Sequence, residues 1–368
     1  MKAYIVDYIG KHSGVQYYID SFTSILKDSF GLEVGILSNY QPDGVAARPF
    51  MIDHYEGNKL QKILKFLMNL RRFRKYIKNN PNDIYIYESY GSLLDVFFLK
   101  ILCKYKGHLI DVHEAIALNR DNSKWLKTKF AKIYSTKIRT LMSHSLRSQK
   151  YLTEFGYSGY HFKVPHFRYH VKPEFDESEV AQDIRDAVDP ARINLLMFGT
   201  ITKEKGADIF IESLNNLPES HLKRINVIFA GRDFDGSCRS VTPNENVKVK
   251  FVLRFVKDDE LKYLFSKVQF LAMPYRITSQ SGVLEMAFCF KKPIIASNIP
   301  YFKSVLDSYP SFGIISDLEN FDKGIISAID SSRNYFNDAD YNKYTNQETI
   351  ESFKTELGKW IKILEHDN

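Results

Sequence analysis

The stretch NLLMFGTITKEKGAD, residues 194–208, decides the fold class. It begins with an apolar run of strand length, passes through Gly199, and opens a helical pattern after Gly206. A strand, a glycine turn and a helix in this order are the repeating unit of a parallel α/β sheet. The same unit recurs in both halves of the chain, so the sequence predicts parallel strands joined by helical crossovers.

The predicted strands are short runs rich in β-branched and aromatic residues, and amphipathic stretches separate them. In the first half we expect strands at 3–6, 32–37, 84–87, 108–112, 140–142 and 162–164, with helices near 15–29, 59–78, 91–104, 122–138 and 144–155. In the second half we expect strands at 194–198, 226–230, 247–252, 269–273, 293–296 and 312–315, and a last helix near 347–364.

A length of 368 residues fits two medium-sized domains. After Pro173 the alternation lapses into an acidic, weakly periodic stretch, 174–189, which we interpret as the linker region. We predict an N-terminal doubly wound α/β domain at 1–175, a C-terminal doubly wound α/β domain at 176–346, and a C-terminal helix at 347–368 that packs back towards the N-terminal domain. In doubly wound domains the ligand binds at the carboxyl ends of the strands.

The composition indicates a globular protein of a reducing compartment. The chain is 44% hydrophobic and 14% aromatic, which excludes a disordered chain. Its three cysteines are an odd number in no metal-ligand spacing, so we expect neither a disulfide framework nor a structural zinc site. No export signal precedes Asp7, and charges interrupt the most apolar stretch, 91–103. We therefore expect a cytoplasmic protein without a membrane span.

The net charge of +7 is divided unevenly along the chain. Residues 1–175 hold 27 Lys and Arg against 15 Asp and Glu, a net +12, and the remaining residues hold 24 against 29, a net −5. A basic half is typical of contact with nucleic acid or an anionic membrane, although a solvated basic face is also compatible. No nucleic-acid-binding motif accompanies the charges, which favours the membrane.

Two predicted helices contain many of these cations. Residues 59–78 hold eight Lys or Arg and no acid, and no acid lies between Asp121 and Glu154. The apolar residues of 59–78 recur at helical spacing, so we expect one stripe to face the sheet while the surplus cations face an anionic lipid surface. This stripe consists of Leu60, Ile63, Leu64, Leu67, Leu70, Phe73 and Ile77.

Two turns of the second half have the composition of phosphate-binding turns. In the first, Gly199 lets a ligand approach the backbone and Lys205 offers a charge to a diphosphate, with an ordinary strand-to-helix turn as the alternative. In the second, MPYRITSQSGVLEMA at 273–287, Ser281 is a good helix cap whose following amides form an anion site. Glu285 then either accepts a ribose hydroxyl or only complements the helix dipole.

Taken together and in order, these segments resemble the retaining GT-B glycosyltransferases of family four (glycosyl transferases group 1) over essentially the whole chain. The resemblance implies an α/β GT-B fold with two Rossmann-like doubly wound domains facing a central cleft. The domain at 1–175 is then on the acceptor side, and the domain at 176–346 binds the nucleotide sugar. It implies that Lys205 contacts the diphosphate of a nucleotide sugar and that the turn at 281–285 holds the diphosphate and the ribose. The segment VKFVLRFV, 249–256, resembles the strand and loop that hold the nucleobase.

The first half resembles the family more loosely. The segment KHSGV, 11–15, is similar to the glycine loop beneath the donor phosphates, with an ordinary βα turn as the alternative. His113, in DVHEA at 111–115, resembles the histidine that faces the reacting sugar, with a structural histidine as the alternative. The resemblance implies that His113 and Lys205 are catalytic. It implies donor-binding roles for Gly14, Gly199, Lys205, Arg254, Phe255, Val256, Ser279, Gln280, Ser281, Gly282, Val283 and Glu285, and no metal ligand.

Two positions depart from the family pattern. Thr200 stands where the family usually has an arginine, and Ile277 stands where it usually has the glutamate that contacts the sugar hydroxyls. The motif therefore does not specify the sugar. Four neighbouring polar side chains are candidates to replace the missing contact: Arg276, Thr278, Ser279 and Gln280.

The resemblance also implies a reaction that needs no Mg²⁺ and no protein nucleophile. The leaving phosphate takes the acceptor's proton on the front face of the sugar, so the protein has to position the substrates and stabilise developing charge. The sequence contains no recognisable pair of catalytic carboxylates and no metal-ligand motif, and we expect neither a cofactor nor a metal.

We expect a retaining glycosyltransferase that moves a sugar from a nucleoside diphosphate sugar to a saccharide acceptor. The expected acceptor is a lipid-linked saccharide of surface polysaccharide or glycoconjugate assembly, and the expected location is the inner face of the cell membrane, with an anionic membrane surface and no nucleic acid as partners. Two alternatives stay open, namely a GT-B nucleotide-sugar epimerase and a non-catalytic nucleotide-sugar-binding protein. Turnover distinguishes the three.

Overall fold

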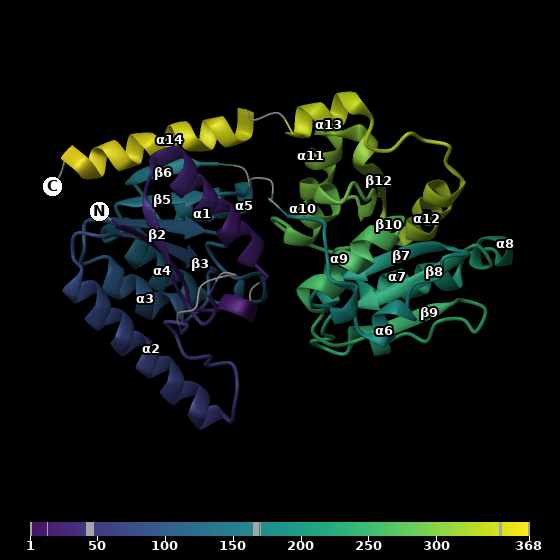
Figure 1. The fold of residues 1–368 in the computed structure, drawn as a ribbon, viewed down its shortest axis with the longest axis horizontal. Helices are drawn as coiled ribbons and strands as arrows, with labels where there is room; N and C mark the ends of the chain where they lie inside the picture. The colour runs from purple at the N-terminus through teal and green to yellow at the C-terminus, as the bar shows by residue number, and fades with distance from the viewer. Residues whose placement is uncertain are drawn as a thin grey trace. The chain divides into compact units, whose positions relative to one another are not determined.

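The computed structural model describes residues 2–12, 14–41, 48–164, 169, 171–345 and 348–366. The chain forms two compact units, unit 1 (Met1–Phe167 with Gln347–Asn368) and unit 2 (Arg168–Asn346), and each contains a parallel sheet with helices packed against it (Figure 1). Ser13 of the expected glycine loop and the expected boundary at 346 and 347 lie outside the described residues.

Unit 1 has a six-stranded parallel sheet in the order β2-β1-β3-β4-β5-β6. All six predicted strands are present, and their ends differ from the predicted ends by at most two residues. The strands are β1 (Lys2–Asp7), β2 (Glu33–Ser38), β3 (Ile84–Ser89), β4 (His108–Val112), β5 (Thr140–Ser143) and β6 (Tyr160–Lys163). The helices are η1 (Gly10–His12), α1 (Gln16–Phe30), α2 (Lys59–Asn79), α3 (Asp95–Leu102), η2 (Leu118–Arg120), α4 (Lys124–Thr136), α5 (Leu146–Glu154) and α14 (Glu348–His366).

Helices cover the sheet of unit 1 because its strands are buried apolar runs. Side chains from α2, α3, α4 and α5 pack with β1, β3, β4 and β5 in one apolar cluster. The last helix, α14, lies beside α1, and the rings of Phe22 and Phe353 are 5.3 Å apart (Figure 1). The final segment of the chain therefore completes the core that the first segment begins.

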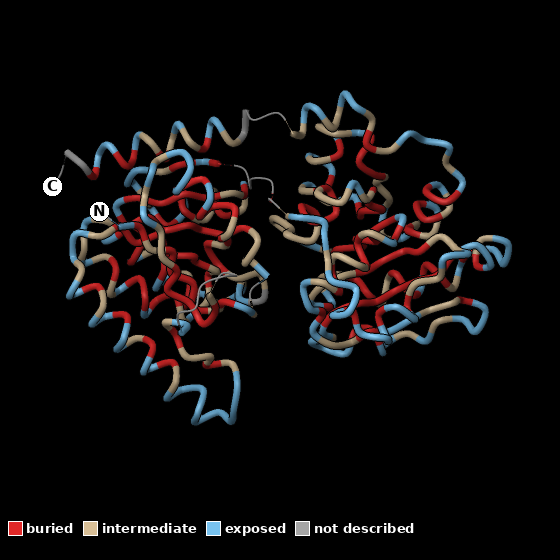
Figure 2. Tube along the Cα trace, viewed as in Figure 1, coloured by how far each residue is buried: buried red, intermediate tan, exposed pale blue. Residues whose placement is uncertain are grey.

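The orientation of α2 differs from the expectation. Its core-facing residues are Phe66, Asn69, Phe73 and Ile77, and Asn69 bonds to both the amide and the carbonyl of Ile52 at 2.8 Å. The first half of the predicted apolar stripe instead faces outward, and Figure 2 shows the N-terminal end of α2 as exposed. The prediction was wrong because spacing identifies an apolar stripe but not the side that a neighbour covers. Within the described ranges, no helix is both long and apolar enough to cross a bilayer.

Unit 2 also has a six-stranded parallel sheet, in the order β12-β11-β10-β7-β8-β9. The six predicted strands are again present: β7 (Ile193–Phe198), β8 (Ile225–Ala230), β9 (Val249–Val252), β10 (Phe270–Met273), β11 (Ile294–Ser297) and β12 (Gly313–Ser316). The helices are η3 (Glu177–Glu179), α6 (Gln182–Arg185), η4 (Lys203–Lys205), α7 (Ala207–Asn215), α8 (Glu219–Leu222), η5 (Ser237–Arg239), α9 (Asp258–Lys267), α10 (Gly282–Cys289), α11 (Pro300–Ser308), η6 (Pro310–Phe312), η7 (Leu318–Asn320), α12 (Phe321–Asp330) and α13 (Asp338–Thr345).

The strand order of unit 2 reverses between β7 and β10. The chain adds β8 and β9 on one side of β7 and then returns to add β10, β11 and β12 on the other side. The turns that follow β7 and β10 consequently leave the sheet in opposite directions. In doubly wound sheets, ligands bind at this point.

The acidic stretch at 174–189, which we interpreted as a linker, is instead folded onto unit 2. Val180 and Ile184 are buried, and Asp183 forms an ion pair with Arg254 at 2.7 Å. Short helical turns bury these apolar side chains, although the stretch is too short to show a clear periodicity in the sequence.

The two faces of α2 give a stability prediction. Phe73→Ala removes a fully buried ring and should lower the free energy of unfolding of unit 1 by about 3–5 kcal/mol. Leu67→Ala, on the outward face of the same helix, should change it by less than about 0.5 kcal/mol. Both tryptophans, Trp125 and Trp360, belong to unit 1, so urea unfolding followed by tryptophan fluorescence measures this unit. Equal losses in both variants would contradict the orientation of α2.

Candidate functional site

The turn after β7 brings a glycine and a lysine together. Gly199 has φ +96°, and a Cβ placed on it would lie 3.1 Å from Nζ of Lys205, at the end of η4. The lysine ammonium lies 5.5 Å from the ring centre of Tyr275. Burial lowers the pKa of Lys205 to about 8. Such a desolvated ammonium is favourably placed to bind an anion, which would restore its charge.

The turn after β10 ends at the N-terminus of α10. Ser281 caps this helix by accepting a hydrogen bond from the Leu284 amide at 3.2 Å, as the sequence predicts. The amides of Gly282 and Val283 have no hydrogen-bond acceptor in the part of the chain that the structure describes. Their donors, together with the positive end of the helix dipole, favour an anion at this position.

The two turns meet at the point where the strand order reverses. The Cβ position on Gly199 lies 3.3 Å from Cγ2 of Val283 as well as beside Lys205. A side chain at residue 199 would therefore enter the space between the lysine and the start of α10. A Cβ on Gly206 would lie 2.1 Å from the carbonyl oxygen of Pro274, so only glycine permits the close approach of the two backbones.

Arg276 joins the two turns. Its guanidinium forms two parallel hydrogen bonds of 2.8 Å with the carboxylate of Asp208 at the start of α7. Its backbone amide donates to the carbonyl oxygen of Glu204 at 2.7 Å. Arg276 was a candidate for the missing sugar contact, but these bonds direct it towards the neighbouring turn.

Glu285 is buried one turn into α10, and a distant residue contacts it. The hydroxyl of Tyr344, in α13, donates to Oε2 of Glu285 at 2.9 Å. The hydroxyl of Tyr169 lies 2.8 Å from the position of a Cβ on Gly282. No sequence signal pointed to either tyrosine, because each is far from α10 along the chain.

The predicted nucleobase segment, residues 254–256, contains one side chain that is paired within unit 2, one that is exposed and one that is buried. Arg254 uses its guanidinium within unit 2, binding Asp183 and the buried Glu260 at 2.7–2.9 Å. Phe255 is 54% exposed, with the guanidinium of Arg232 5.6 Å from its ring centre, and Val256 is buried. The exposed ring of Phe255 is therefore the available apolar surface of this loop.

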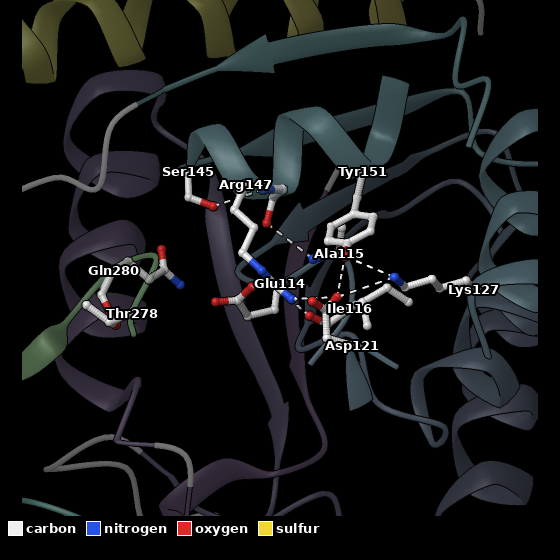
Figure 3. Close-up of polar contacts among 11 residues, drawn as sticks. Glu114, Ala115, Ile116, Asp121, Lys127, Ser145, Arg147, Tyr151, Thr278 and Gln280 are labelled. Atoms are coloured by element: carbon white, nitrogen blue, oxygen red, sulfur yellow. Dashed lines mark hydrogen bonds and ion pairs between the residues drawn. The ribbon is translucent and has the colours of Figure 1, made fainter. Parts of the chain in front are cut away.

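The polar residues before α10 are half-buried in the turn. Thr278 Oγ1 donates to the carbonyl oxygen of Gln280 at 2.6 Å, and Figure 3 labels both residues. Ser279 is also half-buried. Thr200 is exposed, and Ile277, at the position of the family glutamate, is 46% exposed. Neither departure is hidden in the core, and both side chains remain open to a ligand.

Residues 192–331 match the glycosyl transferases group 1 family. This region contains both turns and most of unit 2. No curated protein matches the chain by sequence.

Solved glycosyltransferase structures match the fold of the chain. Sucrose-phosphate synthase (tll1590) from Thermosynechococcus elongatus is 12% identical with a TM-score of 0.67, and the match covers 100% of both chains. Anabaena Alr3699/HepE in complex with UDP and glucose is 13% identical with a TM-score of 0.60 and 99% coverage of each chain. WaaG, a glycosyltransferase involved in lipopolysaccharide biosynthesis, is 13% identical with a TM-score of 0.59, covering 90% of this chain and 91% of WaaG. The chain has the GT-B type of α/β fold, with two Rossmann-like domains.

In unit 1, Gly14 lies between η1 and α1, beyond the carboxyl end of β1. It has φ +69°, and no atom of the described residues lies within 4 Å of a Cβ placed on it. This geometry is compatible both with the predicted glycine loop and with an ordinary βα turn.

His113 follows β4 and is buried against a carboxyl group. Its Nε2 lies 2.6 Å from Oε2 of Glu88 at the end of β3. Burial raises the pKa of Glu88 well above its ordinary value, and the carboxyls of Asp111 and Asp7 raise it further. Burial also lowers the pKa of His113 to about 4. Both pKa shifts favour a neutral carboxyl group whose O–H donates a hydrogen bond to Nε2 of an uncharged imidazole.

One group of side chains has a spacing that a metal ion would require. Among the described residues, Asp111, His113 and His144 offer ligand atoms within 4.8 Å of one another. His144 Nε2 already lies 2.7 Å from Asp111 Oδ1, and the hydroxyl of Tyr18 donates to Asp111 Oδ2 at 2.6 Å. Hydrogen bonds within the protein therefore account for the arrangement of these side chains.

The loop after His113 is fixed to α5 by an arginine. Arg147 donates to Oε2 of Glu114 at 2.6 Å, to the carbonyl oxygen of Ile116 at 2.9 Å and to Oδ1 of Asp121 at 3.2 Å (Figure 3). The hydroxyl of Tyr151 donates to the same carboxylate of Asp121. The sequence did not single out this network, which holds the backbone that follows His113.

The contact between Arg276 and Asp208 gives a prediction about the first turn. Arg276→Gln should loosen η4, because the side-chain bonds to Asp208 and the turn are lost. Amide hydrogen exchange in residues 200–205 should accelerate about ten-fold. This factor corresponds to about 1.5 kcal/mol, the lower end of the range for hydrogen bonds to charged groups. Mass spectrometry of exchanged peptides measures this rate. Arg239→Gln, at an exposed cation elsewhere in unit 2, is the control, and unchanged exchange in the Arg276 variant would contradict the assigned role.

Proposed function

We propose that the protein is a glycosyltransferase that binds a nucleoside diphosphate sugar in unit 2. The observation that carries the proposal is the convergence of Lys205, Gly199 and the start of α10 at the reversal of strand order. Two backbone amides and one ammonium face the same space, which suits a diphosphate. This space lies in the part of the chain that matches the group 1 family.

The remainder of the donor has matching groups nearby. Glu285 is one helical turn from the amides of Gly282 and Val283 and is our proposed partner for the ribose hydroxyls. Tyr344 donates to one of its oxygens and orients the carboxylate. The exposed ring of Phe255, beside the Arg232 guanidinium, is our proposed surface for the nucleobase.

We further propose that transfer proceeds with retention and without a metal. Lys205 would stabilise the charge that develops on the leaving diphosphate, and the phosphate would take the acceptor's proton. His113 would contact the donor sugar, held in one tautomer by Glu88. The support is the resemblance of DVHEA to the family segment, together with a hydrogen bond that fixes the ring.

The proposed acceptor is a lipid-linked saccharide at the inner face of an anionic membrane, in surface polysaccharide or glycoconjugate assembly. The basic first half supports this location, and one matching structure, WaaG, is a glycosyltransferase of lipopolysaccharide biosynthesis. Turnover tests the proposal against its alternatives. A transferase releases a nucleoside diphosphate only with an acceptor, an epimerase converts the nucleotide sugar alone, and a binding protein does neither.

Two substitutions test the donor site. Lys205→Ala should weaken binding of the preferred nucleoside diphosphate, among UDP, GDP and ADP, by about 10 to 150-fold, because a charge-assisted contact of about 1.5–3 kcal/mol is lost. Glu285→Gln should weaken nucleoside diphosphates but leave inorganic pyrophosphate unchanged, because only the former carry ribose. Calorimetric titration of both ligands against both variants gives these values. Unchanged nucleotide affinity in Lys205→Ala would remove the basis of the donor site.

The lowered pKa of Lys205 predicts a pH dependence of binding. The ammonium is charged below pH 8 and loses its proton as the pH rises through about 8, whereas a bound diphosphate would keep it charged. Nucleoside diphosphate affinity should therefore be constant between pH 7 and 7.5 and fall by up to about ten-fold per pH unit above 8. Lys205→Arg should bind with no such fall, because arginine stays charged. An equal decline in both variants would assign the effect to another group.

A further inference from the structure

The N-terminal half of α2 exposes a row of large apolar side chains. Leu60 is 65% exposed, Leu64 52% and Leu67 53%, and Ile63 and Met68 are also exposed. Phe97 of α3 is a further exposed apolar side chain beside α2, where its ring lies 5.9 Å from that of Phe66. We call Leu60, Ile63, Leu64, Leu67, Met68 and Phe97 the α2–α3 apolar surface.

This surface results from the way in which α2 is anchored. Phe66, Phe73 and Ile77 share the buried side, and Asn69 ties that side to the backbone of Ile52. At 100° per residue, Leu60, Leu64 and Leu67 point away from that side of the helix. Adjacent exposed leucines on a protein surface mark a site of contact with an apolar partner.

The same outward side becomes cationic further along the helix. Arg71, Lys75 and Lys78 follow Leu60, Leu64 and Leu67 at helical spacing, and all three are exposed. Lys59 and Lys62 flank the leucines at the other end. None of the eight cations of α2 has an ion-pair partner within 4.0 Å among the residues that the structure describes, and α2 contains no acid.

The combination identifies the partner. Nucleic acid would use the cations but not the leucines, and a second copy of this chain would bring one basic surface against another. An anionic lipid bilayer uses both, since its headgroups pair with the cations and its acyl region accepts the leucines. We propose that the α2–α3 apolar surface inserts into the interfacial region of an anionic membrane, with α2 lying in the membrane plane.

This inference names the surface by which the protein would reach the membrane in the proposed function. Its biological role rests on the proposed function, whereas the exposed surface itself is observed independently of it. Nucleotide binding belongs to unit 2 and is measured without lipid. A chain that binds vesicles through α2 but binds no nucleotide would contradict the proposed function alone. A chain that binds nucleotide but not vesicles would contradict this inference alone.

Vesicle binding tests the surface through its two components. Full-length protein is sedimented with phosphatidylcholine vesicles with or without phosphatidylglycerol, at low and high ionic strength. We expect binding to the anionic vesicles that falls with salt. The variant Leu60→Asn, Leu64→Asn, Leu67→Asn should bind at least about 100-fold more weakly, because it removes the apolar side chains and keeps every cation.

A charge variant and a matched control complete the set. Arg71→Gln, Arg74→Gln, Lys75→Gln should weaken binding by about 100-fold, or about five-fold for each cation near the headgroups. Lys267→Gln, Lys303→Gln, Lys323→Gln removes three exposed cations of unit 2 and should bind vesicles as the wild type does. The leucine and charge variants should keep the wild-type urea unfolding transition of unit 1, followed by tryptophan fluorescence, which shows that they are folded.

Insertion of the α2–α3 apolar surface into the bilayer can be measured separately by tryptophan fluorescence. Leu64→Trp, in a Trp125→Phe background, places a reporter on the surface, while Trp360 stays buried in α14. Anionic vesicles should shift its emission to the blue, and lipids brominated in their acyl chains should quench it. Wild-type vesicle affinity in the leucine variant, or an unshifted reporter in protein that sediments with vesicles, would overturn the proposal. So would a dimer in sedimentation velocity that the leucine variant abolishes without any change in vesicle binding.

Discussion

The reversal of strand order between β7 and β10 is the constraint on which the proposed site depends. Parallel strands place all their carboxyl ends at one edge, and only at a reversal do neighbouring turns diverge and leave backbone open between them. Gly199 keeps side-chain atoms out of this space, and Gly206 lets the two turns touch. The ion pair between Arg276 and Asp208 then fixes the turns to each other. The proposed anion site follows from this topology together with one lysine.

Most strands were predictable because they are apolar runs that a parallel sheet buries on both faces, whereas the edge strands β6 and β9 also contain exposed residues. The helix expected at 91–104 is shorter, Asp95–Leu102, because Asp95 accepts hydrogen bonds from the amides of Tyr90 and Ser92 and holds the preceding residues in a turn. The outward side of α2 was not predictable. Apolar periodicity is the same whether leucines meet a sheet or solvent, and a tertiary contact, that of Asn69 with Ile52, selects the buried side.

The site shows the same limit. Two local motifs follow neighbouring strands and so bring three residues close together: Gly199, Lys205 and Val283. Because each motif is continuous in the sequence, these residues could be predicted. Tyr344 lies 59 residues after Glu285, and Glu88 lies 25 residues before His113. Neither belongs to a motif, and only the fold brings them to their partners. The donors of Arg254 likewise pair with Asp183 and Glu260, which no local pattern indicated.

The return of α14 to unit 1 has a consequence for biosynthesis. Unit 2 is encoded as one uninterrupted segment, whereas unit 1 is completed only by residues that follow it. On the ribosome, unit 2 can therefore finish folding while α1 still lacks α14, although the N-terminal domain usually folds first. Until Phe353 and Trp360 emerge, the apolar side of α1 around Phe22 stays uncovered, which exposes the nascent chain to aggregation at that stage.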